Sequence, residues 1–513
     1  MSEPASESDV TAPSRSADRA ERGSATSVLA DLEPRVIMDF FDTLTQIPRG
    51  SENEKGVSDW VVRFAQERGL EVHQDDLYCV LVRKPGTPGY EDAPTVILHG
   101  HLDMVCAKDD GVEFDFLTQG LNLLRDGDYI TADGTSLGAD NGIGVSYILA
   151  LLDSSDIPHP PLEAVLTSME EKGKVGGANF DTSLLRGTRM IDFNWITDEE
   201  ILAGCGGDMS ATIDIPAEWE TPDEPDLVAR TLTVHGLNGG HCEFDIHMER
   251  INAIILMARA LNTMLAQGFD LRIDSPFGGA QNNVIAADAE TTVVLSQNDA
   301  DALEVAIKDV VETVASEYEI ADPNVRIDLT PAEMPAKVFS REATRRLTRS
   351  IVLLPNGVVS WSLKIPGIVE CSSNLGTVRP TEDGCQLMVT ITSGVTSRKH
   401  DVLDRMRALA ALAGNGVTIE QYGHDAPEFP YLEDSPLLQL AKEAYRESYG
   451  KEPDVKVSNC SLELGMFSRR LPGLDTISIG TELHWLHSKD EKFSISSVQG
   501  TWKFIQKLVP TLR

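Results

Sequence analysis

The stretch Val96-Ile97-Leu98-His99-Gly100-His101-Leu102-Asp103-Met104 decides how the rest of this chain is interpreted. Its apolar first half is typical of a central strand that is covered on both faces. His101 and Asp103 stand at the end of this strand, and because strand side chains alternate, the two point to the same side. One of them could bind a metal ion while the other orients it. Backbone carbonyls could equally satisfy the histidines, so both interpretations stay open on this stretch alone.

The bulk composition describes a large and acidic chain. Its 513 residues are enough for two to three domains, and 41% hydrophobic residues is ordinary for globular proteins. Asp and Glu number 81 against 44 Lys and Arg, so the net charge of -37 opposes phosphate backbones and argues against nucleic-acid binding. Solubility is the simplest explanation of this charge, although a negative field also favours cationic substrates and metal ions.

The cysteines and the N-terminal segment predict a location. The seven cysteines are scattered and form no C-x-x-C pair, which argues against a disulfide framework or a zinc knuckle and fits a reducing cytoplasm. Residues 1–29 are rich in Ser, Ala, Glu and Arg without an apolar core, which predicts a disordered tail and not a signal peptide. No stretch reaches the roughly 18 consecutive apolar residues of a membrane span, so no membrane partner is expected.

Two further motifs place carboxylates near the ends of predicted elements. Asp140 stands in a glycine-rich loop before an apolar helix at 145–152, where an aspartate is more commonly an N-cap. Glu170 and Glu171 follow a second buried strand, predicted at 162–169, and adjacent glutamates at a strand end point to opposite sides. One of the pair could hold a metal ion while its neighbour faces a substrate, unless both are simply solvated.

The order of these motifs resembles a known family. His101-x-Asp103, Gly138-Ala139-Asp140-Asn141-Gly142 and Glu170-Glu171-x-Gly173 are similar to motifs of the zinc-dependent exopeptidases, the clan of aminoacylases, carboxypeptidases and dipeptidases. More closely, the chain resembles the bacterial aminoacyl-histidine (Xaa-His) dipeptidases, also called cytosolic non-specific dipeptidases. Individually weak matches continue from Gly204-Cys205-Gly206-Gly207 to His487-Ser488-Lys489-Asp490-Glu491, along nearly the whole chain.

The resemblance implies a site for two metal ions, with Zn²⁺ expected and Mn²⁺ or Co²⁺ able to fit the same ligands. By match to the family motifs, Asp140 bridges the ions, with His101 on one of them and Glu171 and His487 on the other. Two such ions together activate a water molecule and polarise the scissile carbonyl.

Three further residues have catalytic roles in this resemblance. Asp103 is the carboxylate that fixes the His101 ring. Glu170 takes the proton of the attacking water and passes it to the leaving amine. His241 reaches from a second domain to stabilise the tetrahedral intermediate, as an oxyanion donor does, and capping of its own loop is its alternative role.

The fold class that the resemblance implies is α/β. A zinc-exopeptidase-type catalytic domain, with a mixed central sheet flanked by helices, is expected from residues 30–214 and 426–513. An inserted α/β lid domain is expected at 215–425. The residues support this insertion, since an acidic linker with prolines at 216–225 precedes alternating strands and helices.

The chain departs from the family pattern at ligand and substrate positions. Asn194 stands where the family has the aspartate that completes the first metal site, and its uncharged amide predicts weaker metal binding there. Asp192 lies on the same strand face and could substitute only if the backbone shifts. Two family segments that carry lid arginines read Asn283-Val284-Ile285-Ala286-Ala287 and Thr392-Ser393-Gly394 here, so both arginines are absent.

Two substrate-binding residues, Asn283 and Glu463, are expected in segments where the chain departs from the family pattern. Asn283 keeps its place although the arginine that follows it in the family is gone. Glu463 also stays, while the family's nearby histidine is replaced, and an acidic side chain is a natural partner for the ammonium of a free N-terminus.

Three functions therefore stay open. The first is metal-dependent hydrolysis of dipeptides, either Xaa-His-like or of broad specificity. The second is hydrolysis of another small amide, such as an N-acyl amino acid, and the third is a catalytically weak homologue that binds ligands or partners. The retained base, bridging aspartate and terminal metal histidines favour an enzyme. A cytoplasmic location is expected, and a homodimer stays open because the sequence does not define the oligomeric state.

Overall fold

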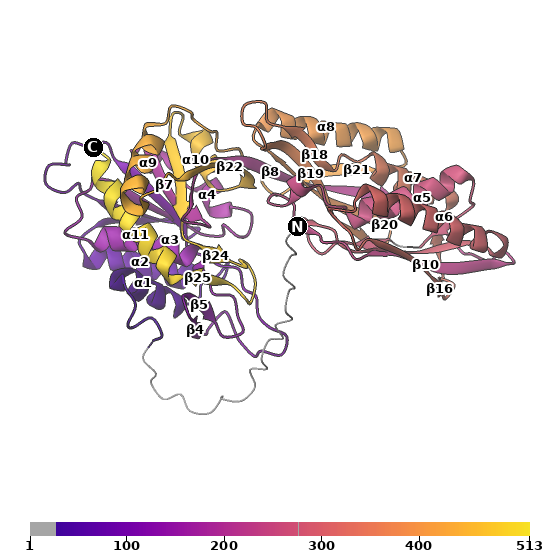
Figure 1. Ribbon diagram of the computed structural model, residues 1–513, viewed down its shortest axis with the longest axis horizontal. Coiled ribbons are helices and arrows are strands. Elements are labelled where there is room, and N and C mark those ends of the chain that lie inside the picture. The colour runs from indigo at the N-terminus through magenta and orange to yellow at the C-terminus, as the bar shows by residue number, and fades with distance from the viewer. Residues whose placement is uncertain (1–26, 275) are drawn as a thin grey trace, which may run out of the picture.

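The computed structural model describes residues 27–274 and 276–513, which form two lobes side by side (Figure 1). Each lobe has a hydrophobic core of its own. The first lobe draws its main core from residues 29–203 and 437–512, and the second lobe draws its core from residues 209–406. The segment of the second lobe is thus inserted between the two parts of the first.

Strands that are buried on both faces form the middle of the first lobe. β3 (Val96–His101) pairs in parallel with β6 (Leu162–Thr167) on one side and with β7 (Arg189–Trp195) on the other. β23 (Asp475–Gly480) continues the sheet in parallel beyond β7, while β2 (Val80–Lys84) pairs antiparallel with β6. This mixed sheet confirms the predicted α/β fold class.

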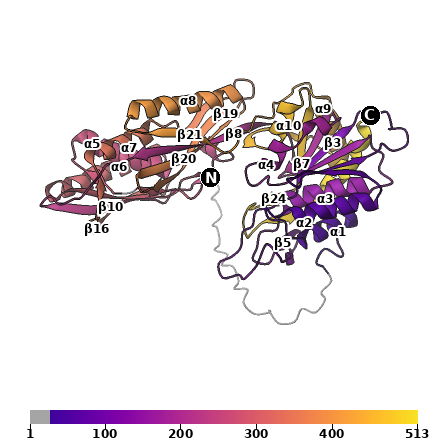
Figure 2. The same ribbon diagram turned by 180° about the vertical axis from the view of Figure 1, so that it is seen from behind.

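Helices cover both faces of this sheet (Figure 2). Val96 and Leu98 of β3 point into the larger core, and Ile97 points into a smaller core on the opposite face. The larger core contains α1 (Arg35–Thr45), α2 (Lys55–Glu67), α3 (Ala139–Asp153), α9 (Pro436–Tyr449) and α11 (Ile495–Leu508). The smaller core contains α10 (Leu464–Arg470), which packs beside α4 (Val175–Asn179). The remaining strands of the lobe are β1 (Glu71–Gln74), β4 (Leu123–Asp126), β5 (Tyr129–Ala132), β22 (Asp454–Ser461), β24 (Leu483–His484) and β25 (Lys492–Ser494).

One long strand joins the lobes. β8 (Glu200–Pro216) is almost wholly buried in its first half, where it pairs in parallel with β22. From residue 208 onward its burial alternates, and the buried residues Met209, Ala211, Ile213 and Ile215 belong to the second core. A continuous apolar run suits a sheet covered on both faces, and alternation suits a sheet covered on one. Because β8 runs through the predicted domain boundary at residue 215, the exact boundaries stay a prediction.

The second lobe is a largely antiparallel sheet with helices packed over it (Figure 1). β8 pairs antiparallel with β20 (Gly384–Ser393) and β21 (Thr418–Tyr422), and β19 (Val369–Pro380) pairs with β20. The helices are α5 (Ala253–Gln267), α6 (Gln297–Glu317), α7 (Arg341–Leu353) and α8 (Thr396–Ala413). The other strands are β9 (Trp219–Glu220), β10 (Leu227–His235), β11 (Gly240–His241), β12 (Arg272–Ile273), β13 (Phe277–Gly278), β14 (Val284–Ile285), β15 (Ala289–Ser296), β16 (Arg326–Ala332), β17 (Val338–Phe339) and β18 (Gly357–Trp361).

Most of the predicted disordered tail, residues 1–29, lies outside the described residues. The described part begins at residue 27, and Leu29 is only 1% exposed within the first core, so the prediction extended too far at this end. All seven cysteines are free. In the described part of the chain, no helix is both long and apolar enough to cross a membrane.

Candidate metal centre

Two histidines and two carboxylates meet beside the end of β3. His101 Nε2 lies 3.0 Å from Asp140 Oδ1, and His487 Nε2 lies 3.4 Å from Asp140 Oδ2. His487 Nε2 also lies 2.9 Å from Glu171 Oε1. Asp140 therefore stands between the imidazoles of His101 and His487, which the fold brings together from distant parts of the chain.

Each of these side chains comes from a different part of the first lobe. His101 ends β3, Asp140 lies in the first turn of α3, and Glu171 follows β6. Gly100 lets α3 approach β3, because a Cβ at this position would lie only 2.6 Å from Asn141 Oδ1. His487 has a φ of 60°, a left-handed conformation that costs free energy in residues other than glycine and often marks functional sites.

The donor set fits a divalent metal ion. Ligand atoms of His101, Asp140 and Glu171 all lie within 4.8 Å of one another. Burial, together with the Asp140 carboxylate, raises the pKa of Glu171, as expected where two carboxylates share a site without a cation between them. Glu171 Oε1 is buried and accepts no hydrogen bond of good geometry. Imidazole nitrogens and carboxylate oxygens are ligands of catalytic Zn²⁺, and Mn²⁺ or Co²⁺ accepts the same set.

The buried carboxylate of Asp103 fixes the histidine and the two glutamates together. Asp103 Oδ1 lies 3.4 Å from His101 Nδ1 and accepts a hydrogen bond of 3.0 Å from the Glu170 N–H. Oδ2 accepts hydrogen bonds from the Glu171 N–H at 3.2 Å and from Ser51 Oγ at 2.8 Å. One side chain thus orients a metal-ligand candidate and the backbone that carries Glu170 and Glu171.

A cavity of about 500 Å³ opens from this cluster between the two lobes, and Glu170 lines it. The first lobe contributes Asp140, Glu171 and His487 to its wall, and the second lobe contributes His241. Burial raises the pKa of Glu170 to about 8, with Glu171 adding to the rise and His101 opposing it. A carboxylate that binds a proton this readily, beside the ligand cluster, is suited to accept the proton of a water molecule.

His241 faces the cavity as a neutral ring with one defined donor. Its Nδ1 accepts a hydrogen bond of 3.2 Å from the Glu243 N–H, so the ring proton lies on Nε2. Burial lowers the pKa of His241, although Asp245 opposes the change. The Nε2–H group is therefore free to donate to a negative charge that develops in the cavity.

Comparison with known proteins relates this arrangement to a family. Residues 97–511 match the model of peptidase family M20/M25/M40. The chain belongs to this peptidase family. A protein of Escherichia coli K12 named cytosol non-specific dipeptidase is 31% identical over 490 residues, which is 94% of this chain and 99% of that protein.

Solved structures agree with the M20/M25/M40 assignment. The crystal structure of aminoacylhistidine dipeptidase from Vibrio alginolyticus matches with a TM-score of 0.82 and 32% identity, covering 94% of this chain and 98% of that one. The aminopeptidase PepT from Bacillus cereus matches with a TM-score of 0.53 and 14% identity over 94% and 99% of the two chains, which shows the shared fold alone. The family resemblance found in the motifs is confirmed.

Asn194, the departure from the M20/M25/M40 ligand pattern, faces another amide. It lines the cavity, but its Oδ1 accepts a hydrogen bond of 2.5 Å from Asn141 Nδ2. Asp192 is 1% exposed, and its carboxylate binds Ser478 and lies 2.7 Å from His99 Nδ1. Asp192 is therefore engaged elsewhere and does not replace Asn194 as a ligand. The weaker first metal site stays a prediction.

The expectation that Glu463 binds a substrate ammonium is not supported by its position. Glu463 is 2% exposed and, among the described residues, lies outside the cavity wall. Its carboxylate accepts hydrogen bonds from the Gly177 N–H at 2.7 Å and from Thr167 Oγ1 at 2.5 Å, and it lies 3.2 Å from His99 Nε2. These donors hold the charge of Glu463 inside the lobe, behind the metal centre.

One positioning residue was missed by the sequence analysis. Glu491 is 2% exposed and accepts hydrogen bonds from the N–H groups of Leu137, Gly138 and Asp140, at 2.8, 2.9 and 3.2 Å. It thus holds the loop that presents Asp140. The signal was present, because Glu491 ends the same short segment that His487 begins.

The wall that faces a substrate offers few cations. Asn283 lines the cavity, its buried Oδ1 has no hydrogen-bond partner in the part of the chain that the structure describes, and its substrate-binding role stays a prediction. Lys174 is the only lysine or arginine among the described residues of this wall, and its Nζ lies 3.3 Å from Asp208 Oδ1. Sequence reasoning missed this pair, although Lys174 directly follows the motif Glu170-Glu171-x-Gly173 and Asp208 directly follows Gly204-Cys205-Gly206-Gly207.

Proposed function

We propose that this chain is a metal-dependent dipeptidase that hydrolyses the peptide bond of small peptides with the help of two divalent ions. The observation that carries this proposal is the ligand cluster of His101, Asp140, Glu171 and His487 at one side of a closed-in cavity. Similarity to a dipeptidase, which extends over 94% of this chain, supports dipeptides as the substrate class.

The proposed ions are Zn²⁺, with Mn²⁺ or Co²⁺ as alternatives. Asp140 would bridge them, with His101 and Asn194 on one ion and Glu171 and His487 on the other. When bound, the ions supply the positive charge that polarises the scissile carbonyl and makes a water molecule more acidic.

The chain's own residues supply orientation and proton transfer. Glu170 takes a proton from the attacking water and delivers it to the leaving amine nitrogen. Asp103 holds the His101 ring and, through backbone N–H groups, the position of Glu170. His241 donates its Nε2–H to the carbonyl oxygen as that oxygen becomes negative. Asn283, whose buried Oδ1 has no hydrogen-bond partner among the described residues, would accept a hydrogen bond from a substrate N–H.

One observation favours a second candidate, the hydrolysis of another small amide that lacks the dipeptide carboxylate, such as the amide of an N-acyl amino acid. A dipeptide carboxylate needs a cationic partner, and the only lysine or arginine in the described part of the wall, Lys174, is already matched by Asp208. A substrate that does not depend on such a partner would fit this wall as well as a dipeptide does.

We also propose a cytoplasmic location. The name of the Escherichia coli relative places that protein in the cytosol, and seven free cysteines fit a reducing compartment. A homodimer, and the absence of nucleic-acid and membrane partners, stay predictions from the sequence.

Metal analysis of the purified protein, run beside a substrate screen, tests the proposal. We expect hydrolysis of dipeptides such as Ala-Leu, loss of activity on chelation, and recovery when Zn²⁺, Mn²⁺ or Co²⁺ is added back. N-acetyl-leucinamide, which has no carboxylate, serves as the comparison, and faster cleavage of this compound than of any dipeptide would favour the second candidate. A metal-loaded protein that cleaves neither substrate contradicts both.

A further inference from the structure

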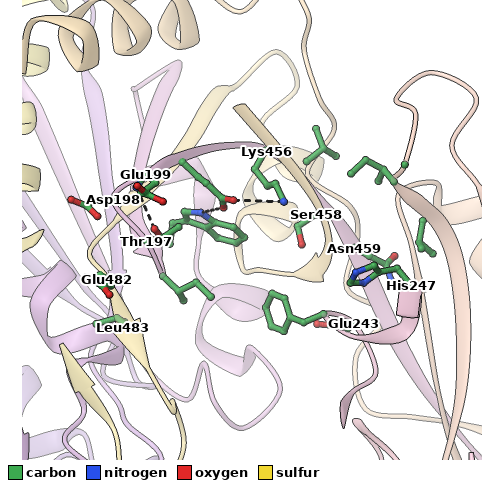
Figure 3. Close-up of a pocket in the computed structure, with 18 of the residues that line it drawn as sticks. Thr197, Asp198, Glu199, Glu243, His247, Lys456, Ser458, Asn459, Glu482 and Leu483 are labelled. Atoms are coloured by element: carbon green, nitrogen blue, oxygen red, sulfur yellow. Dashed lines mark hydrogen bonds and ion pairs between the residues drawn. The ribbon is translucent and has the colours of Figure 1, made fainter. Parts of the chain in front are cut away.

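A second cavity adjoins the cavity at the metal centre, and Figure 3 shows residues that line it. Its volume is about 730 Å³, and four residues, Trp195, Ile196, Glu243 and Phe244, line both cavities. One wall comes from the ends of β7, β8 and β22 in the first lobe, and the facing wall comes from residues 243–247 and 367–369 in the second. A peptide bound at the metal centre therefore has a large adjoining space on the far side of Glu243.

The second cavity has more acidic than basic side chains in its wall. The acidic residues are Asp198, Glu199, Glu200, Glu243 and Glu482, and the only lysine or arginine in the described wall is Lys456. Lys456 Nζ lies 3.6 Å from Glu200, and Lys451, outside the cavity, lies 3.0 Å from Glu199. Glu482 Oε1 lies 2.7 Å from His484 Nε2, while Asp198 and Glu243 form no ion pair in the described part of the chain.

Glu243 is held in place at the border of the two cavities. Its Oε1 accepts a hydrogen bond of 3.3 Å from Thr392 Oγ1 in the second lobe, and its Oε2 accepts one of 3.3 Å from the Ser461 N–H in the first. Burial, together with Asp208, raises the pKa of Glu243 to about 7, with Lys174 opposing the rise. A carboxylate that is destabilised in this way gains more from an added cation than an exposed one does.

Asn459 gives an independent indication of a ligand. This side chain is 7% exposed, lines the second cavity, and has an Oδ1 without a hydrogen-bond partner among the described residues. Its Nδ2 already donates to Ser372 Oγ at 3.0 Å, so the free atom is an acceptor. A buried acceptor without a donor is costly, and a ligand with N–H groups would remove that cost.

We propose that the second cavity is a subsite for a cationic side chain of the substrate and that Glu243 selects this charge. The inference rests on the proposed dipeptidase function and adds its specificity. A lysine or arginine side chain meets both requirements of the site. Its aliphatic stem can lie along Trp195 and Phe244, while its ammonium or guanidinium group donates to Glu243 and Asn459.

The test compares lysine with norleucine, which has a similar stem and lacks the ammonium. The values of kcat/KM for Ala-Lys, Lys-Ala, Ala-norleucine and norleucine-Ala are measured on the wild type. We expect a preference for lysine over norleucine at one of the two positions, and that position shows which residue enters the second cavity. The absence of a preference at both positions overturns the inference.

Variants of Glu243 then assign the preference. Glu243→Gln should reduce the ratio of lysine to norleucine kcat/KM at least about tenfold, mainly through KM, since hydrogen bonds to charged groups have this magnitude. Glu243→Lys should instead favour glutamate over norleucine at the same position. The matched control Glu443→Gln removes an exposed charge on α9 that lines neither cavity, and should keep the wild-type ratio. An unchanged ratio in folded Glu243→Gln contradicts the assignment.

Failure of the inference and failure of the proposed function can be told apart. Hydrolysis of the norleucine dipeptides without a preference for lysine supports the function and overturns the inference. If the wild type cleaves none of the four peptides, calorimetric binding of the same peptides decides. Tighter binding of a lysine peptide than of its norleucine partner, lost in Glu243→Gln, supports the subsite, and equal binding contradicts it. Should Glu243→Gln fail to fold, the conservative Glu243→Asp takes its place.

Discussion

The two histidines of β3 each belong to a cluster with carboxylates, and the two clusters have different roles. The open cluster consists of His101, Asp140, Glu171 and His487 and faces the cavity. The closed cluster consists of His99, Asp192 and Glu463, all at most 2% exposed. The two histidines are separated by one residue and lie on the same side of the strand. Residue type and local spacing therefore do not distinguish them.

The clusters differ in whether a metal ion has room beside their carboxylates. In the closed cluster, burial would lower the pKa of His99, but the hydrogen bonds to Asp192 and Glu463 outweigh it and raise the pKa to about 9. The histidine itself is the cation there, and donors such as Thr167 and Ser478 satisfy the remaining oxygens. In the open cluster the carboxylates likewise outweigh burial and raise the pKa of His101 and His487, but here Asp140 and Glu171 share one site beside a cavity, which leaves room for a divalent ion. The same groups thus form a structural ion pair or a metal site.

The largest effect should come from Glu170→Gln, which tests whether turnover depends only on the residues at the open cluster. Glutamine keeps the shape but cannot take a proton, so kcat/KM should fall about 10²–10⁴-fold. Folding and metal content should stay nearly unchanged, because Glu170 is anchored by its backbone N–H, which the substitution keeps. Steady-state kinetics with metal analysis measures both. Unchanged turnover would mean that another residue is the base, and loss of metal would make Glu170 a ligand.

Asp140→Asn and Asp192→Asn together test the division between the clusters. Asp192→Asn leaves His99 with one charged partner, and loss of one member of a buried ion pair typically costs about 3–5 kcal/mol in the free energy of unfolding. The folded fraction should still bind metal. Asp140→Asn should keep most of the stability and lose metal, because it removes the charge between the two imidazoles. Urea unfolding and metal analysis on both variants check this, and the opposite pattern would exchange the two roles.

The open cluster could be predicted because each member belongs to a short motif that resembles one of the family's motifs. Once the ends of the predicted elements meet, the positions of Asp103, Asp140 and Glu171 follow. Glu463 could not be placed in this way. Its direction depends on the distant Gly177 N–H and on His99, which together draw the carboxylate inward.

Contacts between the lobes could not be predicted from the sequence either, although part of the fold could be inferred. The alternation of β8 after residue 208 is visible in the sequence and predicts a sheet covered on one face. The border position of Glu243 is not visible, because its contacts with Thr392 and Ser461 join three segments that are far apart in the chain.

The smallest effect is expected at Asn194, where the open cluster lacks a charge. If the metal site that includes Asn194 is weak, the wild type should retain one tightly bound ion, at Asp140, Glu171 and His487. It should then need excess metal for its full rate. Asn194→Asp should raise the bound stoichiometry towards two and tighten binding by at least the roughly tenfold that changes outside the ligand set produce. Calorimetric metal titration of both forms measures this.

The result at Asn194 also shows how strongly metal binding distinguishes the open cluster from the closed one. Activity on ordinary dipeptides should rise less than metal affinity in Asn194→Asp, because Lys174 remains the only lysine or arginine of the described cavity wall and stays paired with Asp208. A wild type that already holds two tight ions would show that the amide oxygen is an adequate ligand despite its hydrogen bond from Asn141. If neither form binds metal, the open cluster is held together by protons as the closed one is, and a binding protein becomes the better interpretation of this chain.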